Sequence, residues 1–507
     1  MSERKSRKRT TRRPRPSGTT PQRPWSQLRL AYDPIEVLSS DQVEAIHEAG
    51  LGILEEIGMR VLDRKARGLL ASAGADLDED AMRVRFDRAL VEELAAKAPG
   101  EFTLSARNPE RNVKLGGRNA IFSSISGPAF FCDLDRGRQP GNYQELCNFM
   151  KLVQSLNVLH QEGGWACEPL DLPAGTRHLD SYYAQITLLD KNWQPWGLGR
   201  DRAIDALEMV AISLGKKREE LLDQPVFTCV INTNSPLQLD VPMAEGLISM
   251  AEHGQVNVIT PFTLSGAMSP ITIAGALAQQ HAEALAGIAL CQVVRPGVPV
   301  MYGGFTSNVD MKTGSPAFGT PEYTKAAQAS GQLARHLGVP FRSSNVTAAN
   351  TVDAQSTYES AMALWGALMG GAHLVNHAAG WIGGGLTASF EKLIVDAEML
   401  QLMAAYFDPI EVTQDTLAVS AIREVGPAGH FFGAAHTIER FTDAFYVPLL
   451  SNWDNYDTWL ERGGTTATQR ANTIWKKLLE DYEQPPLDPA IDEALRDYMN
   501  QRKRELE

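Results

Sequence analysis

Apolar residues recur every three to four positions near the start of the chain. From Asp41 to Val61, DQVEAIHEAGLGILEEIGMRV has the spacing of an amphipathic helix, and Ser39 or Ser40 precedes it as a cap. Two shorter helices and a β-rich stretch follow, and Gly127-Pro128 breaks that stretch, which predicts a hairpin. These segments are Lys65–Ser72, Asp87–Ala96 and Asn119–Asp135.

After about residue 150, short apolar or aromatic runs alternate with longer helical patterns. The predicted strands are Val158–Gly163, Gln194–Gly199, Val226–Asn232, Val256–Phe262, Val298–Thr306, Phe341–Val346 and His373–Ala379. The helices predicted between them are Thr176–Asp190, Ala203–Leu214, Met243–Glu252, Thr272–Val293, Thr320–His336 and Thr357–Met369. So many strand–helix units favour an α/β fold of the (β/α)8 TIM-barrel type over a doubly wound sheet. The eighth strand is either Asn119–Cys132 or a segment near Ala418–Val425.

The pattern divides the chain into four parts. A disordered basic tail is expected over residues 1–28, an N-terminal α+β cap over 29–150 and the barrel core over 151–425. A C-terminal extension over 426–507 is expected to pack on the barrel and to end in a charged helix from Pro489 onward.

Charge is distributed unevenly along the chain. Nine of the 48 basic residues precede Trp25, where the only acid is Glu3, so the rest carries 39 basic against 60 acidic residues. The tail is interpreted either as a tether for an acidic partner or as a solvated terminus. The acidic body argues against nucleic acid as the main ligand.

Cysteine usage and hydropathy indicate where the protein resides. The five cysteines, Cys132, Cys147, Cys167, Cys229 and Cys291, lack the spacing of a metal site. This favours reduced thiols in a cytoplasmic protein. No stretch approaches the roughly 20 apolar residues of a membrane helix. No apolar segment of a secretion signal follows the N-terminal arginines.

The carboxyl ends of the predicted strands carry the candidate chemistry, because active sites of such barrels lie there. Trp165, Trp196, Tyr302, Phe305 and Trp381 all fall at or near these ends. Aromatic faces attract a quaternary ammonium by about 1–2 kcal/mol per desolvated ring. The rings predict a cage for such a cation, or they only seal the top of the core.

Arg342 is the most informative charged residue. Strand parity places it on the same face as Ser344 and Val346. An arginine inside a barrel needs an anionic partner. That partner is either an internal carboxylate, Glu162 or Glu168, or the carboxylate of a betaine-type substrate held bidentately.

Two further residues are candidates for catalysis. His377 and Glu162 end predicted strands, and His377 is either a satisfied core residue or a polar contact to the substrate. The remaining histidines have no metal-ligand spacing, so no metal is assigned. Gly383-Gly384-Gly385 predicts a loop over the pocket rather than a dinucleotide site.

Several ordered motifs resemble one family. Val339–Gln355, VPFRSSNVTAANTVDAQ, is similar to the segment of trimethylamine:corrinoid methyltransferases that carries pyrrolysine. Other similar motifs, in order, are Asn234-Ser235-Pro236-Leu237, Ser265-Gly266-Ala267-Met268-Ser269-Pro270, Ala282–Ile288, Val294-Arg295-Pro296-Gly297 and Gly319-Thr320-Pro321-Glu322. The resemblance runs from about Leu38 to Tyr482 and implies a barrel.

The same resemblance places Val346 at the pyrrolysine position. Its aliphatic side chain cannot form the electrophilic adduct, so the substrate is expected to arrive already quaternary. The resemblance implies methyl transfer from a small betaine-type amine to the cobalt of a corrinoid (cobalamin) on a separate protein, with no tightly bound cofactor. The absence of an arginine at position 342 in the trimethylamine enzymes points to an acidic substrate.

Two other functions remain open on the sequence. One is a barrel lyase or isomerase acting on a small carboxylic acid without a corrinoid, with Glu162 or His377 as base. The other is a betaine-binding protein without catalytic activity. A homo-oligomer is expected in each case.

Overall fold

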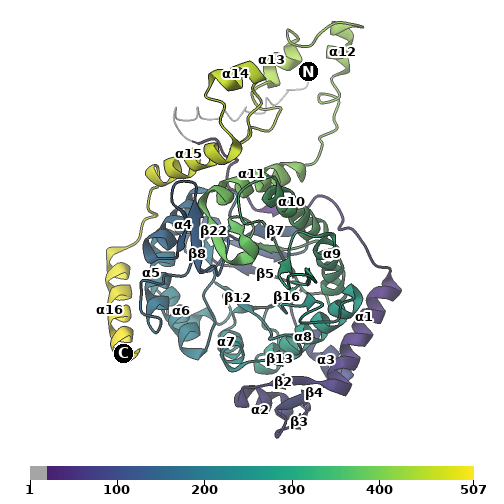
Figure 1. Cartoon of the computed structure of the whole chain (residues 1–507), viewed down its shortest axis with the longest axis vertical. Helices are drawn as coiled ribbons and strands as arrows, with labels where there is room; N and C mark the ends of the chain where they lie inside the picture. The colour runs from purple at the N-terminus through teal and green to yellow at the C-terminus, as the bar shows by residue number, and fades with distance from the viewer. Residues whose placement is uncertain (1–19, 507) are drawn as a thin grey trace, which may run out of the picture.

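The computed structural model describes residues 20–506 of the chain (Figure 1). The described helices are α1 Ser40–Gly52, α2 Arg64–Ser72, α3 Arg88–Ala95, α4 Tyr143–Ser155, α5 Arg177–Leu188, α6 Arg200–Ser213, α7 Val241–Glu252, α8 Ile273–Val294, α9 Pro321–His336, α10 Ala354–Met369, α11 Phe390–Tyr406, α12 Val419–Val425, α13 Ala435–Arg440, α14 Tyr456–Glu461, α15 Ala467–Glu480 and α16 Pro489–Leu506. Within the described part, no helix is long and apolar enough to span a membrane.

A curled parallel sheet of the TIM-barrel type forms the centre. Its strands are β7 Asn119–Phe122, β10 Gln161–Glu162, β11 Asn192–Trp193, β12 Thr228–Ile231, β14 Val256–Ile259, β16 Val300–Gly303, β19 Phe341–Ser344 and β20 Leu374–Asn376. Pairing runs from β12 through β14, β16, β19 and β20 to β7. A bridge between Ser123 and Gln161 continues it to the parallel pair β10–β11. The described part thus has one curled sheet with six parallel strands and a separate parallel pair, β10–β11, which the bridge joins to it.

The helices α4 to α11 follow these strands and surround the sheet (Figure 1). The strands are buried on both faces; for example, all four residues of β14 are buried. Leucine, valine, isoleucine and alanine from strands and helices form one large core cluster. Buried parallel strands covered by helices are typical of α/β proteins, as the sequence predicts.

β7 identifies the missing eighth strand. It pairs in parallel with β20, so the candidate Asn119–Cys132 contains the strand, whereas Ala418–Val425 holds helix α12. The predicted hairpin over Asn119–Asp135 is wrong. The second half, β8 Phe130–Asp133, pairs with β9 Gly137–Pro140 and β22 Thr387–Ser389 instead of β7. The first barrel strand thus lies inside the segment assigned to the cap.

The N-terminal part contains smaller antiparallel elements. Its strands are β1 Leu28–Arg29, β2 Met59–Val61, β3 Asp76–Asp78, β4 Arg83–Arg85, β5 Glu101–Leu104 and β6 Val113–Gly116. The helix predicted from Asp41 to Val61 ends earlier than expected. α1 passes into a π turn, Ile53–Ile57, and then into β2. Gly58 has φ +77°, and a Cβ there would lie 2.4 Å from the Val84 carbonyl oxygen, so glycine is needed where the chain turns.

The two chain ends differ from the expectation. The first 19 residues of the predicted disordered tail lie outside the described residues, but residues 20–28 pack on the body. Gln22 Nε2 donates to the Ser155 carbonyl (3.0 Å), and Leu28 is buried. α16 begins at Pro489, as predicted, and contacts α5 and α6.

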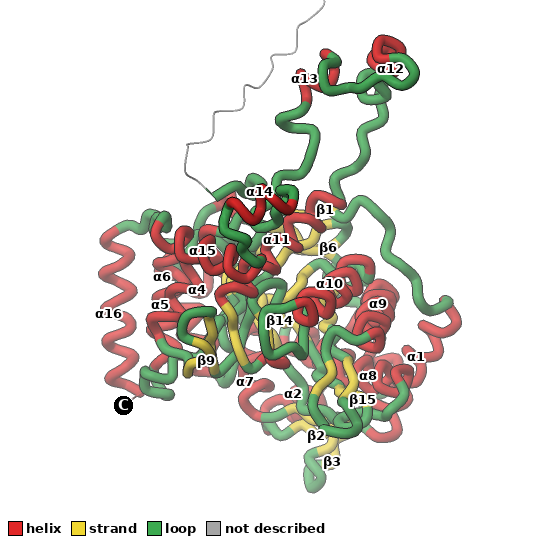
Figure 2. Tube along the Cα trace, turned by 45° about the horizontal axis from the view of Figure 1, so that its top comes forward, coloured by secondary structure: helices red, strands yellow, loops and turns green. Residues whose placement is uncertain are grey.

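The C-terminal extension does not pack on the barrel throughout. α15 packs on α11, yet residues 409–448 project away from the body (Figures 1 and 2). The expectation that this aromatic-rich region covers the barrel is therefore wrong for these residues. The remaining strands are β13 Gln238–Leu239, β15 Leu264–Ser265, β17 Ser307–Val309, β18 Pro316–Ala317 and β21 Trp381–Ile382.

Candidate functional site

A cavity of about 550 Å³ lies at the carboxyl ends of the parallel strands. Most of the residues that line it follow these parallel strands, and β12, β19, β20, β21 and helix α7 contribute one residue each from within the element. They are Ser126, Gly127, Gln194–Leu198, Val230, Asn232–Ser235, Met243, Thr260, Phe262, Met268, Phe305, Arg342, Asn376, His377 and Trp381. This is the end of a barrel where loops assemble active sites. We call it the central cavity.

Arg342 is the only charged side chain among the residues that line the central cavity. It is 2% exposed, and its Nε and Nη1 atoms have no hydrogen-bond partner within residues 20–506. Its guanidinium lies 5.3 Å from the centroid of the Phe305 ring. Burial lowers the pKa of Arg342 to about 10, so the group still carries its charge at neutral pH.

The two internal carboxylates proposed as partners of Arg342 are engaged elsewhere. Glu168 pairs with Arg177 at 2.6 Å. Glu162 accepts hydrogen bonds from the backbone N–H of Gly164 (2.9 Å) and Trp165 (3.0 Å). An unpaired charge that is removed from water is costly. Arg342 is thus a buried cation whose protein surroundings supply no anion.

Four of the aromatic candidates line the central cavity or its wall. Trp381 lies over Phe305 with ring centroids 6.0 Å apart and planes at 24°. Trp196 also lines the cavity, and Trp165 stacks behind it at 5.0 Å and 13°. Tyr302 lies elsewhere, since its hydroxyl contacts Gln280 and His281. The structure therefore brings Trp196, Phe305 and Trp381 together with Arg342 but not Tyr302.

His377 lines the cavity beside Arg342. Its Nδ1 lies 3.2 Å from the Ser344 hydroxyl, and its ring meets Trp381 edge to face at 4.3 Å. Burial, and then the charge of Arg342, hold the pKa of His377 well below its usual value. The imidazole is therefore neutral at physiological pH. A neutral ring next to a cation is a polar contact rather than a second positive charge.

Glu162 and Val346 do not line the cavity. The Glu162 carboxylate anchors the Gly164–Trp165 turn, in which both residues have positive φ (91° and 62°). Burial raises the pKa of Glu162 to about 7. Val346 follows the end of β19 and belongs to the buried core. The position at which the resemblance places pyrrolysine is thus filled by a packed aliphatic side chain.

Sequence reasoning did not assign a role to several polar residues of the cavity. Gln194 Nε2 donates to the Thr228 hydroxyl (2.8 Å) and lies 3.4 Å from Asn376 Oδ1. Asn232 Nδ2 donates to the Thr260 carbonyl (3.0 Å). Phe262 adds a further ring, 5.2 Å from that of Phe305. Asn232 and Phe262 end predicted strands, and this position is the signal that the sequence offers for them.

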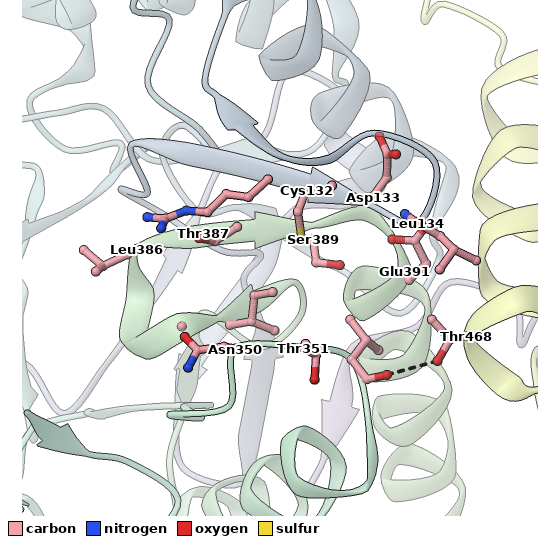
Figure 3. Close-up of a pocket in the computed structure, with 15 residues that line it drawn as sticks. Cys132, Asp133, Leu134, Asn350, Thr351, Leu386, Thr387, Ser389, Glu391 and Thr468 are labelled. Atoms are coloured by element: carbon pink, nitrogen blue, oxygen red, sulfur yellow. Dashed lines mark hydrogen bonds between the residues drawn. The ribbon is translucent and has the colours of Figure 1, made fainter.

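Figure 3 shows the lining residues of a second cavity, of about 610 Å³. Ile382 lines this cavity while its neighbour Trp381 lines the central one, so β21 separates the two. Glu391 lies in its wall, where its Oε1 accepts from Asn472 Nδ2 and Trp475 Nε1 at 2.9 Å each. Helix α15 is thereby attached to α11 in the wall of the second cavity.

The glycine loop behaves as part of this wall. Gly383–Gly385 forms a short 3-10 turn between β21 and β22, with all three φ angles positive. Among residues 20–506, no group of three or more His, Cys, Asp or Glu side chains is arranged to hold a metal ion. The assignment of no metal site stays an expectation.

Comparison with known proteins agrees with the motifs. Residues 4–507 match the family described as Trimethylamine methyltransferase (MTTB). The chain is 39% identical over 471 residues to a glycine betaine methyltransferase of Desulfitobacterium hafniense (strain Y51), which covers 93% of this chain and 98% of that protein. It is 27% identical to the trimethylamine methyltransferase MttB of Desulfitobacterium hafniense (strain DSM 10664 / DCB-2), over 90% of this chain and 92% of that protein.

A solved structure shares the fold. The monomethylamine methyltransferase MtmB of Methanosarcina barkeri superposes with a TM-score of 0.53 at 10% identity, over 89% of each chain. At that identity the likeness concerns the fold alone. The sequence match extends over almost the whole length, and the chain belongs to the trimethylamine methyltransferase family.

Proposed function

We propose that the protein transfers a methyl group from a small quaternary amine with a carboxylate, of the betaine type, to the cobalt of a corrinoid on a separate protein. As a member of its family, the chain is a methyltransferase. The substrate and the acceptor are the content of the proposal. A complete (β/α)8 barrel that begins at β7, inside the segment 29–150, with a C-terminal extension over 426–507, is the architecture that goes with it.

The unpaired Arg342 guanidinium is the observation that carries this proposal. A substrate carboxylate would supply the anion that the protein lacks, and arginine can hold it with two parallel hydrogen bonds. The ring of Phe305 lies beside the guanidinium, and the ring of Trp381 stacks on that of Phe305. Their faces would attract the ammonium of the same molecule. A zwitterion would thus match both the guanidinium and the aromatic rings of the central cavity.

The chemistry requires little acid–base help from the protein. When bound, a cobalt(I) corrinoid supplies the electron pair that forms the bond to the methyl carbon, and the carbon–nitrogen pair remains on nitrogen. The leaving group is a neutral tertiary amine, so no proton is needed. The residues of the cavity hold and orient the methyl group. The aromatic rings would attract the quaternary ammonium of the substrate more strongly than the neutral amine group of the product, which favours release.

The cavity fits a small amine and an acceptor that approaches from outside. Its volume of about 550 Å³ lies in the range of small-molecule sites. Trp196, Leu198 and Phe262 line it and are partly exposed. These side chains would meet an incoming corrinoid.

The test is methylation of reduced corrinoid protein, followed by the absorbance of cobalt. Glycine betaine and related carboxylate betaines should react, choline should react poorly, and trimethylamine should not react, because Val346 offers no adduct-forming group. Trimethylamine turnover at the rate of a betaine would contradict the proposal. Turnover of a carboxylic acid without any corrinoid would favour the lyase instead, although Glu162 lies off the cavity.

A further inference from the structure

Residues 409–448 form a projection that we call the arm. It leaves the body after α11 and contains α12 and α13 (Figures 1 and 2). It returns at Leu449, whose backbone N–H donates to Glu398 Oε2 of α11 at 2.7 Å. Both ends of the arm are therefore attached to one helix, while its middle lies away from the barrel.

The arm exposes a concentration of large apolar side chains. Among residues 409–448, Ala421 and Ala434 alone are buried. Ile410, Phe432 and Phe445 are 87%, 88% and 82% exposed. Single exposed apolar residues are ordinary, but a cluster of this kind marks an interaction surface.

The arm nevertheless has a defined shape. Arg440 Nη2 binds Asp415 Oδ2 at 2.7 Å and so joins its outgoing and returning limbs. This ion pair is exposed and contributes little free energy. Within residues 20–506, burial of apolar surface, which stabilises most folded segments, is confined in the arm to Ala421 and Ala434. Its apolar side chains need a surface that another molecule supplies.

The body carries a receiving surface at the root of the arm. A groove of about 520 Å³ is lined by apolar, polar and charged residues, which are Arg23, Ser26–Ala31, Arg118, Ala404, Phe407, Asp408 and Pro409. The exposed side chains Tyr406 and Leu402 flank it on α11, and the Tyr406 ring lies 5.3 Å from that of Tyr32. We call this surface the root groove.

The root groove lies on the face opposite the central cavity. Arg118 immediately precedes β7, so it marks the amino ends of the strands, whereas the central cavity lies at their carboxyl ends. A partner that must reach the central cavity would approach the other face of the same chain. The arm and the root groove are therefore unsuited to a protein that delivers a methyl acceptor.

We propose that the occupant of the root groove is the arm of a second copy of this chain, and that each copy covers the groove of the other. The protruding surface and the receiving surface belong to one sequence and adjoin one another. If a two-fold axis relates the copies, each arm lies in the root groove of the other copy, and both surfaces of both copies are covered. Aromatic side chains bury about 150–250 Å² each, so the arm's rings supply on the order of the 800 Å² per partner of a stable interface.

The first test is the mass of the full-length protein in solution across a range of concentrations. Wild type should be a dimer or a multiple of one. Phe441→Glu with Phe445→Glu should raise the dissociation constant at least about tenfold, with circular dichroism and melting temperature unchanged. Met311→Glu is the matched control, since Met311 is 66% exposed outside the arm. A monomeric wild type at tens of micromolar would overturn the proposal.

A complementation experiment distinguishes arm exchange from any other interface. Tyr406→Glu damages the groove and should weaken association, as should Leu402→Glu if the first variant does not fold. Mixing the arm variant with the groove variant should restore a heterodimer, because one arm and one groove in that pair are intact. Failure to restore association, with both variants folded, overturns arm exchange. Neither readout depends on methyl transfer, so the result is independent of the proposed function.

Discussion

The aromatic rings of the central cavity and those of the arm are similar in kind and opposite in environment. Phe305 is 5% exposed and is held among Phe262, Phe318 and Trp381, whereas Phe432 of the arm is 88% exposed. The cavity rings are fixed by their neighbours before any ligand arrives. Phe432 has one ring neighbour among residues 20–506, His430 at 6.2 Å, and that contact leaves it exposed.

This difference teaches what each region lacks. The central cavity is packed and its backbone is paired, but it contains a cation without an anion, Arg342. The arm contains an ion pair but no core. A small zwitterion would complete the first region, and a large apolar surface would complete the second. The predictions below test whether the two regions are independent.

The largest effect is expected at Arg342. Arg342→Ala should weaken transition-state binding of a carboxylate betaine by about 2–5 kcal/mol, because it leaves the substrate carboxylate unpaired. The value of kcat/KM should therefore fall roughly 30-fold to several thousand-fold. Arg342→Lys should also lose activity, since an ammonium cannot replace the bidentate geometry. The rates are measured by cobalt methylation.

Choline serves as the matched substrate for this experiment, because it lacks the carboxylate. The rate of cobalt methylation from choline should hardly change when Arg342 is replaced. Equal losses for betaine and choline, accompanied by a lower melting temperature, would instead assign Arg342 to the core.

Substitution of Glu162 should have a smaller effect than substitution of Arg342, and it should change the free energy of unfolding rather than substrate binding. Burial raises its pKa from 4.5 to about 7 in the folded protein, so the folded state binds a proton more tightly than the unfolded chain does. Its contribution to the free energy of unfolding is greatest below pH 4.5 and is lost between pH 4.5 and 7, by up to about 3 kcal/mol.

The advantage of wild type over Glu162→Gln should therefore shrink as pH rises from 4.5 to 7.5. Urea unfolding of both proteins at several pH values measures this difference in the free energy of unfolding. A difference that stays constant or grows with pH would show that the carboxylate is charged in the folded state at low pH.

The barrel could be predicted from the sequence because its signals are local. Runs such as Val256–Ile259 are buried on both faces and flanked by helical patterns, and they need no knowledge of distant contacts. One strand was placed too late: β11 is Asn192–Trp193, whereas Gln194–Gly199 is loop. Pro195 and Gly197 disfavour a strand there, but the aromatic composition of the segment suggested one.

The other errors depend on contacts distant in sequence. The apolar spacing of α1 continues into β2, and these residues form a strand because β2 pairs with β4 and β13. Tyr302 was grouped with the cage because it ends a strand, but its hydroxyl binds Gln280 and His281 of α8. The aromatic residues of the arm suggested burial on the barrel, and composition alone cannot show whether a hydrophobic segment is covered by its own chain.

Trp381 should contribute less free energy to substrate binding than Arg342 does. Trp381→Ala should weaken substrate binding by roughly 1–2 kcal/mol, because it removes one ring from beside the ammonium. Trp165→Ala should weaken binding less, since Trp165 lies behind Trp196 and does not line the cavity. Calorimetric titration with betaine measures both. Equal affinity for wild type and Trp381→Ala, with folding intact, would remove the cage.

The smallest effect is expected for the coupling between a substitution in the arm and a substitution in the central cavity. Phe432→Ser in the arm should change betaine affinity by less than about 0.5 kcal/mol, and its effect should add to that of Trp381→Ala within the same margin. Substitutions at distant sites without shared partners are additive to about 0.3–0.5 kcal/mol. The arm leaves the body at the amino-end face of the strands, and Trp381 lies at the carboxyl-end face. A double-mutant cycle of betaine affinities, with each variant's oligomeric state recorded, measures the coupling. A coupling above about 1 kcal/mol would mean that association through the arm alters the cavity, and the two regions would then have to be treated as one functional unit.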